Sequence, residues 1–215
     1  MKIYCISGLG ADKRVFQFLD LPKHKMVHLE WIEPEPKETL PQYALRLAEK
    51  IDKSEPYALL GLSFGGMLAI EIAKVYHPQK LFVLSSITGK KEVPLLHRFA
   101  GAIKLPEIIP AQILKTPNFL TYMAFGLETP ESKAMLDDIL EQTNPNFLVW
   151  ALGAIFNWKN ETEVQMTRIH GSKDKILPVN MKNEKYRIEN GGHFAIIDRA
   201  KEFSEIINKE LLEFG

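Results

Sequence analysis

Short aliphatic runs alternate with amphipathic stretches along this chain, and that alternation limits its fold more than any other feature. Strands that alternate with helices are typical of the α/β class, in which helices cover both faces of a mostly parallel, doubly wound sheet. The aliphatic runs predict strands at residues 3–7, 25–30, 57–62, 81–86, 165–170 and 185–189. The amphipathic stretches predict helices at residues 13–19, 40–53, 65–76 and 200–214.

The alternation stops between residues 88 and 161, where no convincing strand is found and aromatic residues and prolines are frequent. An insertion of this length is too long for a loop in a compact domain. We therefore expect a helical cap at 88–161, inserted into a single α/β core made of residues 1–87 and 162–215. Packing accounts for most of its aromatic residues, and some should line a cleft: Phe99, Phe119, Tyr122, Phe125, Phe147, Trp150, Phe156 and Trp158.

The charge balance excludes several classes of protein. The 215 residues carry 27 Lys and Arg against 27 Asp and Glu. This composition lacks the basic surface of a nucleic-acid binder or a membrane-surface protein, so neither partner is expected. No segment approaches the roughly 20 consecutive apolar residues of a membrane-spanning helix. The single cysteine, Cys5, cannot form an internal disulfide, which favours a reducing cytoplasm.

The segment Gly61-Leu62-Ser63-Phe64-Gly65 matches the pattern GxSxG and joins a predicted strand to a predicted helix. A nucleophilic serine must project from such a tight turn, and its glycines leave room for a strained backbone. The helix N-terminus also favours the negative charge that develops near the serine. Ser63 is therefore the candidate nucleophile, and the alternative is a glycine-rich turn with an incidental serine.

A serine nucleophile needs a base and an acid at the same edge of the sheet. His193, in Gly191-Gly192-His193-Phe194, follows the last predicted strand, and its alternative role is that of an exposed turn residue. Asp174 lies in the loop after strand 165–170, and its alternative role is to cap a turn. Four other carboxylates between or near these residues fit the required position less well: Asp137 and Asp138 in the cap, Glu184 before the last strand, and Asp198 on the next helix.

An oxyanion hole needs a second backbone N–H from a loop after an earlier strand. The segment Ser7-Gly8-Leu9-Gly10 follows the first predicted strand, so the N–H groups of Leu9 and Phe64 are the candidate donors. The same glycines could begin a dinucleotide-binding loop, but that fingerprint needs a glycine at position 13, where Lys13 stands. Four histidines show no ligand spacing with one another or with the cysteine, so neither a cofactor nor a metal is expected: His24, His28, His77 and His97. His170 ends a predicted strand and is expected to be structural.

The order of these elements along the chain resembles the α/β-hydrolase superfamily, over nearly the whole sequence. The family's nucleophile turn matches residues 61–65, its acid loop matches 171–178, and its histidine loop matches 191–194. The resemblance implies a Ser63, His193, Asp174 triad. Two features differ from the family: Ser7 stands where many members carry a histidine, and the two leading antiparallel strands are absent, which shortens the N-terminus.

These residues predict a cofactor-independent serine hydrolase that cleaves a carboxylic ester or thioester of a small molecule through an acyl-enzyme. One alternative is a hydrolase or lyase that breaks a carbon–carbon bond with the same triad. Another is a ligand sensor that keeps the pocket but turns over slowly or not at all. Apolar acyl groups should be preferred, because the cap is rich in Phe and Trp.

Overall fold

The computed structural model describes residues 1–9, 11–93, 122, 125–178 and 186–212. Within these residues, six strands form one sheet in the order β2-β1-β3-β4-β5-β6, and every neighbouring pair is parallel. This confirms the α/β class, and each strand lies where the sequence predicted one, with slightly different ends. The strands are β1 (Lys2–Ile6), β2 (Lys25–His28), β3 (Tyr57–Leu62), β4 (Lys80–Leu84), β5 (Thr167–Gly171) and β6 (Tyr186–Ile188).

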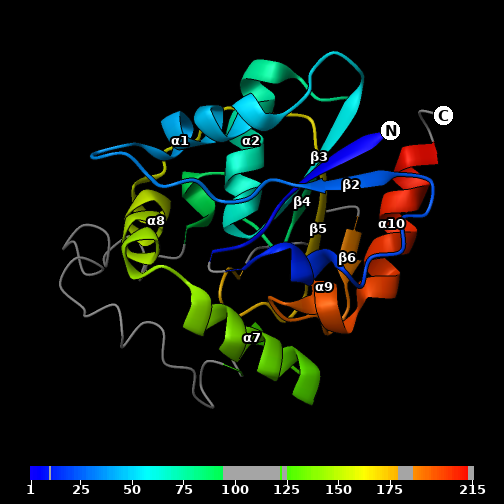
Figure 1. Cartoon of the computed structure of the whole chain (residues 1–215). Helices are drawn as coiled ribbons and strands as arrows, with labels where there is room; N and C mark the ends of the chain where they lie inside the picture. The colour runs from blue at the N-terminus through cyan, green and yellow to red at the C-terminus, as the bar shows by residue number, and fades with distance from the viewer. Residues whose placement is uncertain (10, 94–121, 123–124, 179–185, 213–215) are drawn as a thin grey trace.

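Successive residues of the strands enter two separate apolar cores, one on each face of the sheet. On β3, Leu59 packs into the first core and Leu60 into the second. Because parallel strands are buried on both faces, they carry continuous aliphatic runs. The first core lies under α1 (Leu40–Leu47) and α2 (Phe64–Tyr76), and the second lies under α9 (Ala195–Asp198) and α10 (Ala200–Leu212), as Figure 1 shows.

The helix predicted at 40–53 is shorter than expected. Thr39 and Gln42 form a capping box at the start of α1, and the α-helix ends at Leu47. The chain continues as a short 3-10 helix, η2 (Ala48–Lys50). The helix predicted at 13–19 is likewise a 3-10 turn, η1 (Lys13–Phe16), which Asp12 caps through the Arg14 N–H.

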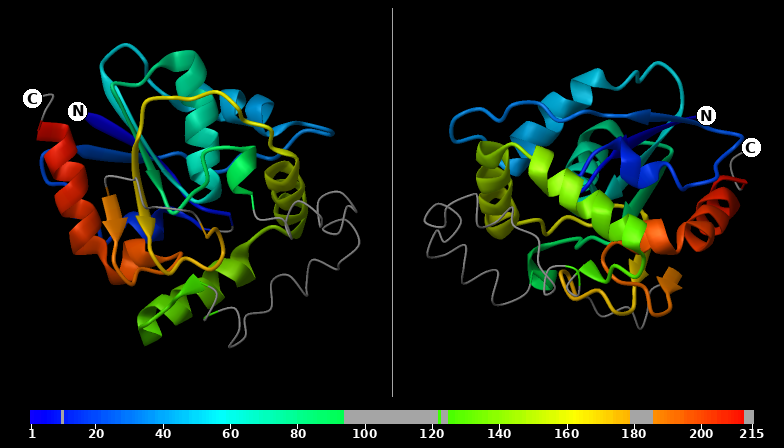
Figure 2. Two further views of the ribbon diagram at one scale, coloured as in Figure 1. Left: turned by 180° about the vertical axis from the view of Figure 1, so that it is seen from behind. Right: turned by 60° about the horizontal axis from the view of Figure 1, so that its bottom comes forward.

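Three helical segments lie between β4 and β5 in the described part of the predicted cap: η3 (Lys90–Glu92), α7 (Pro130–Gln142) and α8 (Pro145–Asn157). A proline follows the N-cap in both α7 and α8, where its missing N–H costs no hydrogen bond. All views place α8 and α10 on opposite sides of the molecule (Figures 1 and 2). Phe99 and Phe119 lie outside the described residues, and the cap boundaries at 88–161 stay a prediction.

No helix in the described ranges has both the length and the apolar character that crossing a bilayer requires.

Substitutions in the central strand β3 should lower the free energy of unfolding more than substitutions at the surface. Leu60 on β3 is fully buried, so Leu60→Ala should lower the free energy of unfolding by about 2–5 kcal/mol through lost contacts and a residual cavity. Leu212, at the end of α10, is 66% exposed, and Leu212→Ala should change it by less than about 0.5 kcal/mol. Urea denaturation followed by circular dichroism measures both values. Equal losses in the two variants would contradict this description of the core.

Candidate active site

Ser63 occupies the tight turn between β3 and α2. Its backbone has φ 52° and ψ −117°, a conformation that non-glycine residues rarely adopt and that costs about 1–3 kcal/mol. The turn is held because the Ser63 N–H donates to the Leu84 carbonyl at 2.8 Å. A Cβ atom at Gly61 would lie 2.4 Å from the Gly65 carbonyl oxygen, and one at Gly65 would lie 2.2 Å from the Ile6 carbonyl oxygen. Glycine is therefore required at both positions of the GxSxG pattern.

Three side chains from three loops form one hydrogen-bonded row. His193 Nε2 lies 2.9 Å from Ser63 Oγ, and His193 Nδ1 lies 2.8 Å from Asp174 Oδ2. Asp174 and His193 are 5% and 2% exposed, whereas Ser63 is only partly buried. An imidazole between a hydroxyl and a carboxylate can accept the hydroxyl proton while the carboxylate stabilises the resulting charge.

The parallel sheet explains why these loops meet. Register pairs Leu62 with Leu84 and Gly171 with Ile188, so the ends of β3, β4, β5 and β6 lie at one edge. The acid loop and the histidine loop then contact each other directly, because the Lys173 N–H donates to the Gly191 carbonyl at 2.9 Å. This bond joins the loop of Asp174 to the loop of His193.

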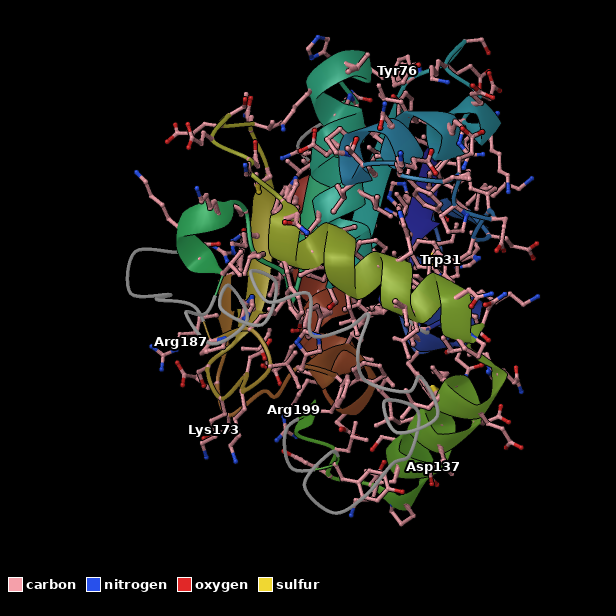
Figure 3. All side chains as sticks on the ribbon, turned by 90° about the vertical axis from the view of Figure 1, so that its left-hand side faces the viewer. Trp31, Tyr76, Asp137, Lys173, Arg187 and Arg199 are labelled. Atoms are coloured by element: carbon pink, nitrogen blue, oxygen red, sulfur yellow. The ribbon has the colours of Figure 1, made fainter. Side chains whose placement is uncertain are left out.

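The other candidate carboxylates have different partners. Asp137 accepts a hydrogen bond from the Tyr122 hydroxyl at 2.7 Å, and Asp138 pairs with Arg14. Asp198 accepts hydrogen bonds from the Glu128 N–H and the Thr129 hydroxyl. Figure 3 shows Asp137 well apart from Lys173, the neighbour of Asp174. Glu184 lies outside the described residues.

The loop after β1 lies beside Ser63. A Cβ atom at Gly8 would lie 3.3 Å from Ser63 Cβ. Ser7 Oγ donates to the Ala11 carbonyl at 2.7 Å, and this hydrogen bond joins the two ends of the loop. Phe64 is the first residue of α2, and its N–H therefore has no acceptor within the helix. The roles of Leu9 and Phe64 as oxyanion donors stay predictions.

Opposing effects act on the Asp174 carboxyl. Burial by itself would raise the pKa of this group. The attraction of His193, together with hydrogen bonds from His170 and His193, outweighs burial and holds the pKa of Asp174 well below its usual range. The group is therefore a carboxylate that can accept hydrogen bonds from imidazole.

Two contacts at the site were not anticipated. His170, expected to be structural, lies with its Nε2 atom 3.0 Å from Asp174 Oδ2. The only signal in the sequence was its place at a strand end before the acid loop. Ser86 was not singled out, and its hydroxyl donates to the Ser63 carbonyl at 2.6 Å.

Aromatic side chains pack around the ring of Phe64, the residue that follows Ser63. The Phe64 ring centroid lies 5.8 Å from that of Trp31, 6.5 Å from that of Phe147 and 6.1 Å from that of Trp150. Trp31 comes from the loop after β2, at one end of α8 in Figure 3, and was not expected. A separate cavity of about 930 Å³ lies between α1, α2 and α8, and Ser63, Asp174 and His193 are not among its lining residues.

The low pKa of Asp174 predicts a pH-dependent stability. The pKa of Asp174 is lower in the folded protein than in the unfolded chain, where it is about 3.9. The carboxylate therefore stabilises the folded state at pH values above about 3.9, and this stability is lost as the pH falls towards the pKa of the folded state. Between pH 5 and pH 3 the group should account for about 1 kcal/mol of lost stability, which Asp174→Asn cannot lose. Urea denaturation of both proteins at both pH values measures this difference. Equal losses would contradict a charged, stabilised Asp174.

No protein-family model and no curated protein sequence matches the chain. Solved structures match its fold at low sequence identity. An esterase from Thermogutta terrifontis aligns with a TM-score of 0.73 and 14% identity, over 99% of this chain and 90% of its own. MenH from S. aureus aligns with a TM-score of 0.71 and 18% identity, over 99% of this chain and 94% of its own. Est816, an N-acyl homoserine lactone degrading enzyme, aligns with a TM-score of 0.68 and 16% identity, over 97% of this chain and 92% of its own. The all-parallel sheet and the structural similarity to these proteins show that the chain has the α/β-hydrolase fold.

Proposed function

We propose that the protein is a cofactor-independent serine hydrolase that cleaves a carboxylic ester or thioester of a small molecule. The observation that carries this proposal is the row of Ser63, His193 and Asp174, with 2.9 Å and 2.8 Å between the bonded atoms. The names of neighbouring structures support the choice of bond, because several are esterases or lipases. The strained turn at Ser63 supports the choice of nucleophile.

The first half of the reaction forms an acyl-enzyme. His193 Nε2 takes the proton from Ser63 Oγ as this oxygen attacks the carbonyl carbon of the substrate. Asp174 holds the imidazole in the required tautomer and stabilises its positive charge. The carbonyl oxygen becomes an oxyanion, which the N–H groups of Leu9 and Phe64 stabilise. The carbon–oxygen or carbon–sulfur bond then breaks, and the leaving alcohol or thiol takes the proton from His193.

The second half releases the acyl group. A water molecule gives a proton to His193 Nε2 and attacks the acyl carbon of the ester on Ser63. The same oxyanion donors stabilise the second tetrahedral intermediate. Its collapse returns the proton to Ser63 Oγ and frees a carboxylic acid.

The position of Ser63 favours this chemistry in a second way. Ser63 is the N-cap of α2, a helix of 13 residues. Its N-terminal N–H groups and dipole stabilise negative charge within the first turn. Attack by Ser63 creates that charge at this end of the helix.

The proposed mechanism predicts that Ser63 is the nucleophile. Ser63→Ala should abolish covalent labelling by a fluorophosphonate and lower kcat for a nitrophenyl ester by at least about 10³-fold, because it removes the oxygen that forms the acyl-enzyme in the proposed mechanism. Peptide mapping of the labelled wild type should place the label on Ser63. Ser54→Ala, a change at an exposed serine, should label normally. Label retained in Ser63→Ala would show that the nucleophile is another residue.

The aromatic character of the site predicts which acyl groups are preferred. The Phe125 ring, whose centroid lies 5.6 Å from that of His193, should favour straight apolar acyl chains, and each added buried CH₂ should contribute up to about 0.8 kcal/mol to transition-state binding. A panel of acyl esters, with dicarboxylic monoesters and vinylogous diketones alongside, measures relative kcat/KM. Phe125→Ala should weaken the preference, and Tyr76→Ala, at the far end of α2, should not. A strong preference for dicarboxylate or phosphorylated substrates, or for the diketones, would contradict the proposal.

A further inference from the structure

His170 lies at the end of β5 and is fully buried. Its Nε2 atom is 3.0 Å from the Leu177 carbonyl oxygen and 3.0 Å from Asp174 Oδ2. Both neighbours accept hydrogen bonds and cannot donate them, so Nε2 carries a proton, which it donates to the Leu177 carbonyl while it lies close to Asp174 Oδ2. Among the described residues, Nδ1 of the same ring has no hydrogen-bond partner. The ring is thus held from one side, through the nitrogen that faces Asp174.

Four N–H groups surround the Asp174 carboxylate. Oδ1 accepts from the backbone N–H groups of Ile176 and Leu177, both at 2.9 Å. Oδ2 lies against His193 Nδ1 at 2.8 Å and His170 Nε2 at 3.0 Å. An ionised carboxylate has about four acceptor positions. Three of them are filled by hydrogen bonds, and the His170 ring nitrogen lies close to Oδ2 beside them. A carboxylate held in this way cannot rotate about its Cβ–Cγ bond without losing a contact.

We infer that His170 is a positioning residue that fixes the Asp174 carboxylate, and through it the imidazole of His193. The backbone donors hold Oδ1, and His170 is a second ring nitrogen beside Oδ2, in addition to that of His193. Without it, only His193 remains beside Oδ2, and the carboxylate is held less firmly against that imidazole. This inference rests on the proposed function, because the imidazole is being positioned for proton transfer with Ser63.

A purely structural role is the competing explanation. The hydrogen bond from His170 to the Leu177 carbonyl closes the acid loop, so its loss would lower stability whatever the site does. A positioning role for His170 predicts two further results. The catalytic rate must fall even where the protein is fully folded, and an amide N–H at the position of Nε2 must restore it.

Three variants separate the two roles. His170→Phe keeps the ring and removes the donor. His170→Gln places its side-chain amide nitrogen as many bonds from Cα as Nε2 of histidine, so it can supply the N–H again. Thr167→Val, at the other end of β5, removes a buried hydrogen bond to Glu210 and serves as the control. If His170→Phe does not fold, His170→Asn takes its place, because its shorter amide cannot reach Asp174.

Activity and spectroscopy are both measured well below the Tm of each variant. For His170→Phe we expect kcat for a nitrophenyl ester to fall by about 10²-fold with KM changed by less than about threefold, as when a reacting group is misplaced. The low-field ¹H NMR signal of the His193 Nδ1 proton should broaden, because its acceptor is no longer fixed. His170→Gln should recover most of kcat and the sharp signal. Thr167→Val should lower Tm and leave both unchanged.

Other outcomes overturn the inference. Wild-type kcat and an unchanged His193 signal in His170→Phe would leave His170 only a structural role. An equal loss in His170→Gln and His170→Phe would do the same. If the wild-type protein neither turns over esters nor reacts with a fluorophosphonate, the proposed function fails. The NMR comparison needs no substrate, so it still decides whether His170 holds Asp174 against His193.

Discussion

The close approach of α2 to β1 is the constraint on which the rest of the site depends. At Gly65 a Cβ atom would meet the carbonyl oxygens of Ile6 and Ser7 at 2.2 and 2.3 Å, so the first turn of α2 rests directly on the end of β1. The chain can enter the helix there only through the strained backbone of Ser63. The same approach brings the loop after β1 beside Ser63, where the proposed mechanism requires a second oxyanion donor.

A parallel sheet brings the remaining groups to the same edge, and hydrogen bonds hold them there. The acid loop and the histidine loop are joined by a backbone hydrogen bond, and the Asp174 carboxylate is surrounded by N–H donors. Such fixed polar groups, together with their low exposure, need little rearrangement when charge develops in a reaction. The electrostatics of the site therefore follow from strand order and loop geometry.

The sequence predicts the sheet and selects Ser63, Asp174 and His193 because each depends on a local pattern. Continuous aliphatic runs mark strands such as Tyr57–Leu62, and the glycines around Ser63 mark a close approach. The parts that escape prediction have no pattern that singles them out. His170 has the burial of a core residue in any parallel strand, and its contact with Asp174, four residues further on, depends on how the acid loop turns back. Likewise, the four-residue helix α9 is too short to have a period, and Trp31 lies in a loop without any pattern.

The measurement that tests the account most directly compares kcat among carboxylate variants. Asp174→Asn should fold normally and lower kcat by up to about 10⁴-fold, because an amide opposite His193 Nδ1 favours the wrong imidazole tautomer. Asp137→Asn, Asp138→Asn, Asp198→Asn and Glu184→Gln should each keep most of the activity. If Asp174→Asn keeps most of its activity while one of these other variants loses it, Asp174 is not the acid that acts on His193.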